Sequence, residues 1–421
     1  MIAFFRNRSD FLKNAFKLVA GTAVAQAITF LLTPFITRLY SPSDMGAFTF
    51  FISIVGGFGL IGTLRYEMAI VLQKEDKESV NISFLSILIA LVISLLPLIT
   101  VFFPAFLIRL DPLLHRWIFL MPPMIFMVSL GNIFQHWYNR KKEYRTLAAA
   151  KILNSTGNNL VALLLGILGV GAWGLLVGNL AGLLFFNFLF VAGIFLRYRH
   201  EAVQIDFPLQ KKLAHKHKDL PLANTPQMLV ELVQLYGIIY LLKAFYSADI
   251  IGLYSLSQRL LQAPMWLIGT SLGQVFYKEA SERYHADGDI KEMVLKTIRL
   301  AAIVALPVLI ILLLAGPWLI GLVFGKAWTE AGQFARILAP MMFFDFIRYS
   351  ISQTPLIIGK TRQMFFITMI GAGLIIISIC LGGFIFRDAT IGFIIFSAML
   401  SIYSIGVILW IVSSVKKERQ E

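Results

Sequence analysis

Charged residues are scarce in this 421-residue chain, where Asp, Glu, Lys and Arg together make up 14%. A soluble domain carries about 25% charged residues, so a fold covered by water on every side is excluded. Cysteine occurs once, at Cys380, which excludes an internal disulfide. Also missing are His or Cys pairs at metal-ligand spacing, a Gly-rich phosphate loop before a helix, and a Ser, His and Asp set at reachable spacing. The sequence therefore predicts no enzyme activity, no metal and no cofactor.

What the chain has instead is long apolar runs, with 58% hydrophobic residues. The runs are continuous and reach the length of about 20 residues that a helix needs to span a bilayer. Strands of a membrane barrel would alternate in polarity over about 10 residues, which these runs do not. We therefore predict an all-α integral membrane protein with twelve spans near 15–37, 45–64, 80–108, 117–138, 146–168, 172–196, 223–243, 250–276, 298–324, 331–357, 363–386 and 390–413.

Basic residues predict the orientation of these spans. Of the 37 Lys and Arg residues, 28 fall in or near the two termini and the even-numbered loops, six in or near the opposite loops, and the remaining three inside spans. This split predicts a multi-pass protein of the cytoplasmic (inner) membrane with both termini cytoplasmic. The positive charge is then a topology signal and an attraction to anionic membrane lipids rather than a nucleic-acid interface. Arg65 and Glu67 end the second span and are expected at its interior interface.

A turn-rich motif occurs twice, as RLYSPSDMGAFTF at 38–50 and as FYSADIIGLYSL at 245–256. Tyr40, which suits the membrane interface, aligns with Tyr246 at an offset of 206, and Pro42 breaks the first helix before Ser43 or Asp44 caps the second. Six spans per copy give parallel repeats related by a pseudo-two-fold axis along the membrane normal. We predict an N-terminal six-helix lobe at 1–196, a cytoplasmic linker at 197–222 and a C-terminal six-helix lobe at 223–421.

Polar residues form stripes inside three of the predicted spans. They recur at helical spacing in the first span (Thr22, Gln26, Thr29, Thr33), the fifth (Lys151, Asn154, Ser155, Asn158) and the seventh (Gln227, Glu231, Gln234). Hydrogen bonding between helices explains such residues taken singly. The matching register of the first and seventh spans favours the wall of a polar cavity.

Besides Lys151, three arginines and two acids are embedded in the spans. Arg259 is near midplane with no acid within a turn, so Glu231, water or an anionic substrate must compensate its charge. Arg348 follows Asp345 by one turn, which leaves a structural ion pair and a substrate contact both open. Arg336 lies a few residues inside the exterior end and either snorkels outward or contacts substrate. Glu231 is a candidate for proton coupling or for pairing with Arg259.

The two motifs, with FYSADIIGLYSLSQRLLQAP at 245–264 and VFYKEASE at 275–282, resemble the polysaccharide-export flippases of the MATE-like superfamily. The resemblance is to Wzx-type O-antigen or oligosaccharide flippases and covers nearly the whole chain. It implies alternating access of two lobes that carry a polyprenyl-pyrophosphate-linked oligosaccharide from the cytoplasmic to the outer leaflet. It also implies a proton or sodium counter-ion and polysaccharide assembly proteins as partners.

By that resemblance, the arginines attract the pyrophosphate and the stripes face sugar hydroxyls. The candidate substrate-binding residues are Arg259, Arg348, Arg336, Lys151, Gln26, Asn154 and Asn158, and the candidate coupling-ion residues are Glu231 and Asp345. The alternatives are a MATE-type multidrug exporter, whose cationic drugs call for buried acids, and a membrane polysaccharide polymerase or ligase, which calls for a sizeable exterior loop. A non-transporting scaffold has no need for unpaired charges at midplane.

Overall fold

The computed structural model describes residues 2–102, 112–199, 204–287 and 289–415. Every regular element in these ranges is a helix. The chain divides into two compact units, Met1–Gly237 and Ile238–Glu421. Unit 1 contains most of the predicted linker, whereas the limits of the two predicted lobes stay predictions. The end of the third predicted span, at 103–108, lies outside the described residues, as do Arg109, Lys416 and Lys417.

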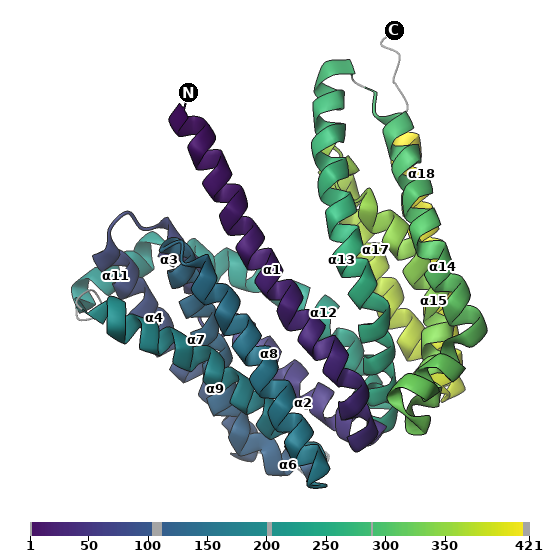
Figure 1. Ribbon diagram of the computed structural model, residues 1–421, viewed down its shortest axis with the longest axis horizontal. Coiled ribbons are helices and arrows are strands. Elements are labelled where there is room, and N and C mark those ends of the chain that lie inside the picture. Colours follow the sequence, from purple (N-terminus) through teal and green to yellow (C-terminus); the bar gives the residue numbers. More distant parts are fainter. Residues whose placement is uncertain (1, 103–111, 200–203, 288, 416–421) are drawn as a thin grey trace. The chain divides into compact units, whose positions relative to one another are not determined.

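Unit 1 is a bundle in which α8 packs against both α1 and α9, and α7 packs against α2 and α4. Figure 1 shows α1 as one long continuous helix. The helices are α1 (Ile2–Leu39), α2 (Pro42–Ile61), η1 (Tyr66–Met68), α3 (Ala69–Leu72), α4 (Asp76–Leu95), η2 (Leu96–Phe102), α6 (Pro112–Trp117), η3 (Ile118–Leu120), α7 (Met121–Arg140), α8 (Tyr144–Ile167), α9 (Ala172–Arg197), α11 (Phe207–Lys216), η4 (Leu220–Asn224) and α12 (Thr225–Phe245), whose last turns pass into unit 2.

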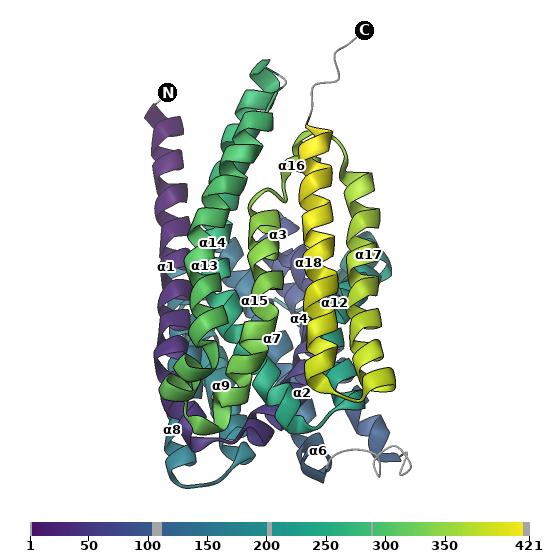
Figure 2. The ribbon, with the colours of Figure 1, turned by 90° about the vertical axis from the view of Figure 1, so that its right-hand side faces the viewer.

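Unit 2 is a second bundle, in which α15 packs against α13, α14 and α18. Figure 2 shows α17 and α18 side by side. The helices are α13 (Ala248–Asp287), α14 (Lys291–Phe324), η5 (Lys326–Trp328), α15 (Thr329–Ser350), α16 (Thr354–Ile357), α17 (Thr361–Cys380), η6 (Leu381–Phe386) and α18 (Ala389–Ser414).

Among the described residues, eight helical segments are long and apolar enough to cross a membrane, and α12 adds a ninth if its bent pair, Leu220–Val233 and Leu235–Phe245, is one span. The eight are Val19–Leu39, Pro42–Ile61, Asp76–Ile99, His115–Arg140, Ala172–Arg197, Lys291–Phe324, Thr361–Phe386 and Ala389–Ser414. Large apolar side chains stay exposed on them, such as Ile303 (67%) and Leu314 (80%) on α14. A surface of this kind suits lipid and would aggregate in water. The chain is a multi-pass membrane protein.

Three of the twelve predicted spans are not among these segments, namely those at 146–168, 250–276 and 331–357. They correspond to α8, α13 and α15, which have 24, 40 and 22 residues. Each is long enough to cross, since a helix rises about 1.5 Å per residue. They carry the polar and charged residues singled out in the sequence, and these lower the mean hydropathy of the three helices.

The turn between α1 and α2 is built differently from the sequence prediction. The cap of α2 is Ser41, whose hydroxyl accepts a hydrogen bond from the Asp44 backbone N–H, while the Asp44 carboxylate accepts one from the Ser41 backbone N–H. The prediction of a Ser43 or Asp44 cap was therefore wrong by two or three residues. Tyr40 is buried, at 2% exposed, and its hydroxyl donates to the Ala162 carbonyl at 2.6 Å. Its level at the membrane interface stays a prediction.

Tyr40 lies so close to α9 that a Cβ on Gly174 would come 2.1 Å from its hydroxyl oxygen. Tyr246, its counterpart in the repeated motif, lies in unit 2 at the start of α18, and a Cβ on Gly392 would come 3.0 Å from its hydroxyl oxygen. In each unit the tyrosine of the motif thus packs onto a glycine near the start of a long helix, α9 in unit 1 and α18 in unit 2. Only glycine leaves room for a ring at that distance.

Candidate functional site

The seam between α1 and α8 holds the polar stripe of the first predicted span. The hydroxyls of Thr29 and Ser155 are hydrogen-bonded at 2.8 Å, and Ser155 also donates to the Ala25 carbonyl at 2.7 Å. The Asn159 amide donates to the Thr29 hydroxyl at 3.1 Å. Asn159 was missed in the sequence, although it lies one residue beyond the predicted stripe. Thr33, 2% exposed, donates to the Thr29 carbonyl. These groups join two helices and are satisfied by each other, as in other membrane bundles.

Beside this seam lies a second group of polar side chains, which are exposed or half-buried. Lys151 is half-buried and donates to the Thr22 hydroxyl at 3.1 Å. Gln26, one turn along α1 from Thr22, is exposed. Asn154 and Asn158 are half-buried on α8, on the side where their carbonyls approach the glycines of α9. Within the described part of the chain, the side chains of Gln26, Asn154 and Asn158 form no hydrogen bond. The stripe is therefore part structural seam and part available polar surface.

Arg259 lies eleven residues after the start of α13 and is exposed. None of the residues that the structure describes forms a hydrogen bond or ion pair with it. At 1.5 Å per residue, this places Arg259 about 16 Å along the helix. Its neighbour Gln258 has a buried side-chain oxygen without a partner in the same ranges.

Two further arginines lie on α15. Arg336 is exposed and, like Arg259, forms no hydrogen bond or ion pair in the described part of the chain. It lies beside α14, since its Cβ is 3.9 Å from the position that a Cβ added to Gly316 would take. Arg348 is bound to Asp345, with Nη2 and Nε at 2.5 and 2.9 Å from Oδ1. Its guanidinium lies 5.9 Å from the ring centre of Tyr403. The structure therefore contains the Asp345–Arg348 ion pair, which was one of the two possibilities from the sequence. Arg336 has no such partner among the described residues.

The predicted coupling acid, Glu231, is exposed on α12 and accepts a hydrogen bond from the Gln227 amide at 3.1 Å. The stripe of the seventh span is therefore present for these two residues, and the side chain of Gln234 lies outside the described part. Glu231 belongs to unit 1 and Arg259 to unit 2, so their pairing stays a prediction.

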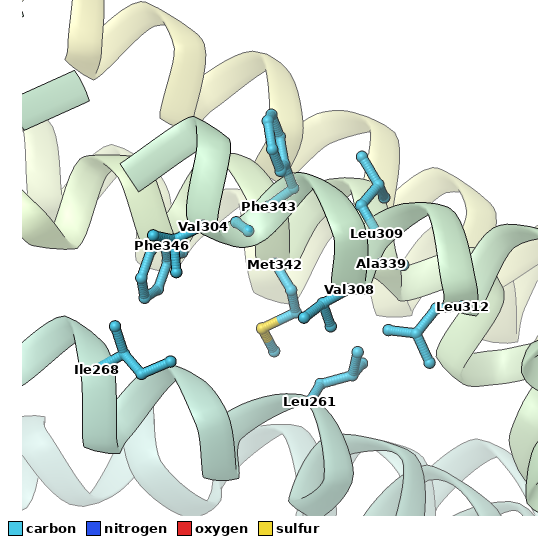
Figure 3. Close-up of a pocket in the computed structure, with 11 residues that line it drawn as sticks. Leu261, Ile268, Val304, Val308, Leu309, Leu312, Ala339, Met342, Phe343 and Phe346 are labelled. Atoms are coloured by element: carbon cyan, nitrogen blue, oxygen red, sulfur yellow. The ribbon is translucent and has the colours of Figure 1, made fainter. Parts of the chain in front are cut away.

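An apolar recess of about 50 Å³ lies in unit 2 between α13, α14 and α15. Figure 3 shows Leu261 and Ile268 of α13 facing Met342 of α15 across it. It is lined by Leu261, Ile268, Val304, Ala305, Val308, Leu309, Leu312, Ala339, Met342, Phe343 and Phe346. Since no lining residue is polar, this recess has no group that could hold a sugar hydroxyl or a phosphate.

A buried acid that the sequence placed at the interface follows the end of α2. Glu67 is 2% exposed; its carboxylate accepts a hydrogen bond from the Thr63 hydroxyl and lies 3.5 Å from Arg65 Nη1. Leu64 and Arg65 have left-handed backbones with φ of 49° and 66°. Consecutive non-glycine residues in that region are strained. Glu67 follows the end of α2, as expected, and is buried in unit 1, while its place at the membrane interface stays a prediction.

Residues 35–333 match the family described as polysaccharide biosynthesis protein, which is well over half of the chain. The chain belongs to the polysaccharide biosynthesis protein family. No curated protein sequence matches this family member. Membership agrees with the resemblance that the two turn motifs indicated.

Solved structures place the fold of this family member among transporters. A multidrug resistance MATE family transporter of the MOP superfamily, in an inward-facing conformation, matches with a TM-score of 0.67 at 14% identity, over 95% of this chain and 100% of that chain. The lipid II flippase MurJ, in an inward closed conformation, matches with a TM-score of 0.66 at 16% identity, over 94% and 87%. The chain therefore shares the all-α fold of these two structures.

Proposed function

We propose that this protein is a flippase that moves a polyprenyl-pyrophosphate-linked oligosaccharide from the cytoplasmic to the outer leaflet by alternating access. The product serves O-antigen or other surface polysaccharide synthesis. Membership of the polysaccharide biosynthesis family supports the substrate class, and one solved neighbour is a lipid II flippase. The observation that carries the proposal is Arg259, an exposed arginine without a described partner deep in α13. Such a charge costs about 2.5–3.5 kcal/mol at the centre of a bilayer, and an anionic substrate offsets that cost.

The architecture that we propose has twelve spans, with α8, α13 and α15 crossing the membrane beside the eight apolar segments and α12. Two parallel six-helix repeats are supported by one contact that recurs. Tyr40 packs onto Gly174 in unit 1, and Tyr246 packs onto Gly392 in unit 2. The excess of Lys and Arg at the termini and even-numbered loops supports an inner-membrane protein with both termini cytoplasmic.

Within this architecture, Arg259 and Arg336 bind the pyrophosphate, with Arg348 as a further contact. Lys151, Gln26, Asn154 and Asn158 bind sugar hydroxyls, for which the unbonded amides of the last three offer donors and acceptors. Glu231, exposed and bonded only to Gln227 within the described residues, couples the cycle to a proton or sodium ion, with Asp345 as the second candidate. Polysaccharide assembly proteins receive the product.

A multidrug exporter is the alternative that one observation favours, namely the likeness to a multidrug resistance MATE family transporter. The span residues argue the other way. Three arginines and Lys151 lie in the predicted spans, against Glu231 and Asp345, and Asp345 is already bound to Arg348. Such a surface attracts anions rather than the cations that a drug exporter binds. A polymerase or ligase finds support in neither the neighbours nor a catalytic set of residues.

The test is transport by the purified protein in proteoliposomes. A fluorescent polyprenyl-pyrophosphate oligosaccharide is placed in the inner leaflet, and its appearance outside is read by a membrane-impermeant lectin. We expect movement of this lipid and none of a cationic dye such as ethidium. Efflux of ethidium without movement of the lipid would overturn the proposal in favour of the exporter.

A further inference from the structure

The short helix α11 of the predicted linker is fixed to unit 1 by an asparagine whose side-chain oxygen and nitrogen both form hydrogen bonds. Asn81 of α4 is buried, and its side-chain oxygen accepts hydrogen bonds from the Asp206 backbone N–H at 2.7 Å and the Gln210 amide at 3.3 Å. Its amide nitrogen donates to the Gln204 carbonyl at 2.8 Å. The Tyr66 hydroxyl also donates to a carbonyl of α11. Helix α11 is therefore a fixed part of this end of unit 1 rather than a loose tether (Figure 1).

The first turn of α11 lies beside a membrane-crossing helix. The ring of Phe207 packs edge-on against Phe84 of α4, with ring centres 6.3 Å apart. Phe84 lies eight residues into the apolar segment Asp76–Ile99, or about 12 Å along it. Phe207 is nevertheless 65% exposed, and Ile205 is 42% exposed. A membrane around the apolar segment of α4 would therefore meet the exposed ring of Phe207, and the exposed Ile205 lies two residues before it in the chain.

The face of α11 that points away from α4 is basic. Lys211, Lys212 and Lys216 are exposed, whereas Gln210 and Leu213 are buried. The three lysines have no acidic partner in the described ranges. The helix therefore has apolar residues at its beginning and unpaired cations along its exposed side, which is the composition of a helix that lies in the membrane interface.

We propose that α11 is a binding site for anionic phospholipid of the cytoplasmic leaflet, with Phe207 and Ile205 among the acyl chains and the three lysines on the headgroup phosphates. Positive charge beside exposed apolar side chains fits a lipid that is negative at the head and apolar below. The site concerns bilayer lipid rather than the transported molecule, so it holds for a flippase and for an exporter alike. It ties unit 1 to the surface of the leaflet at the level of α11.

The experiment titrates the purified full chain in detergent with dioleoylphosphatidylglycerol or dioleoylphosphatidylcholine and follows the melting temperature, because a ligand of the native state raises it. We expect phosphatidylglycerol alone to raise it. The variant Lys211→Gln, Lys212→Gln, Lys216→Gln should weaken the apparent affinity by roughly tenfold or more. The matched control, Lys74→Gln, Lys142→Asn, Arg145→Gln, removes three other exposed basic residues without described acidic partners and should behave as wild type.

The apolar half of the site is tested by Phe207→Ser, which should weaken the response to phosphatidylglycerol, and by Phe207→Leu, which should keep it. An equal response to phosphatidylcholine, or an equal loss in the control variant, would overturn the proposal. So would an equal rise with inorganic phosphate, because a bare anion would then suffice. Without lipid, the variant Lys211→Gln, Lys212→Gln, Lys216→Gln should melt at the wild-type temperature. A weaker response to phosphatidylglycerol then comes from loss of the site and not from loss of the fold.

Discussion

The guanidinium of Arg348 holds the carboxylate of Asp345, one turn earlier on α15, at 2.5 and 2.9 Å from a single oxygen. Both side chains are partly covered, at 23% and 35% exposed, and Tyr403 lies under the guanidinium. A pair that is shielded in this way stabilises the helix chiefly by sparing each charge from being buried alone. Arg348 is thus less available to a substrate than Arg259 or Arg336.

The first prediction concerns this pair. Arg348→Ala should lower the free energy of unfolding by about 1–3 kcal/mol, because Asp345 is left half-buried without a partner. The double variant Asp345→Ala/Arg348→Ala should recover part of that loss. Melting temperatures in detergent and protein levels in the membrane give the comparison. If both variants are stable and both fail in transport, Arg348 contacts the substrate directly.

Arg259→Ala should reduce movement of the lipid-linked oligosaccharide at least tenfold while membrane levels stay normal. Membrane levels should stay normal because no described residue forms a hydrogen bond or ion pair with Arg259, so its removal leaves no group unpaired. Arg259→Lys should keep part of the activity, since lysine retains the charge but lacks the two-pronged geometry that binds phosphate oxygens. Normal surface polysaccharide from cells that carry only Arg259→Ala would count against the proposed site.

Gly332→Ala should destabilise unit 2 by about 1–3 kcal/mol through overpacking. A Cβ on Gly332 would stand 2.4 Å from the Cα of Pro317, so α14 and α15 would have to separate along the side where Arg336 lies. Gly406→Ala on α18 is the control, because nothing lies within 4 Å of the added carbon. The measurement is the melting temperature of each variant, and Gly332→Ala should melt lower than Gly406→Ala. Equal melting temperatures would mean that α14 and α15 can move apart without loss of stability.

The ion pairs of Asp76 should add only a little stability. Its carboxylate accepts hydrogen bonds from Arg140 and, at 2.9 Å, from Lys141. The carboxylate is 45% exposed, so solvent limits the contribution to less than about 1 kcal/mol. Asp76→Asn should therefore lower the melting temperature of the purified protein only slightly, and a large fall would mean that these pairs are shielded from water.

Glu231→Gln should remove the dependence of transport on a proton gradient. The exposed carboxylate accepts a bond from Gln227, and the amide keeps that bond's geometry while it loses the titrating group. Proteoliposomes with and without an imposed pH difference provide the measurement, and Glu231→Asp should stay sensitive to the gradient. A Glu231→Gln protein that still responds would move the coupling role to Asp345 or to a sodium site.

The sequence was sufficient for the membrane class and the helical fold, because continuous apolar runs admit no other structure in a bilayer. It also marked α8, α13 and α15 as different from the other helices, since Lys151, Arg259 and Arg348 interrupt their apolar runs. What it left open was the partner of each polar group. Thr29 binds Ser155 from a helix 126 residues away, and sequence spacing contains no information about that distance.

The turn motif shows the same division. Its repetition in the sequence predicted two copies of one unit, because the order of Tyr, Ser and Gly recurs at a nearly constant offset. Only the tertiary structure decided that Tyr40 is buried against Gly174, that Ser41 caps α2 and that Glu67 lies inside unit 1. Local composition determines which segments are helices and that they lie in lipid. Contacts between segments far apart in the chain determine which polar groups are satisfied and which, like Arg259, have no partner among the described residues.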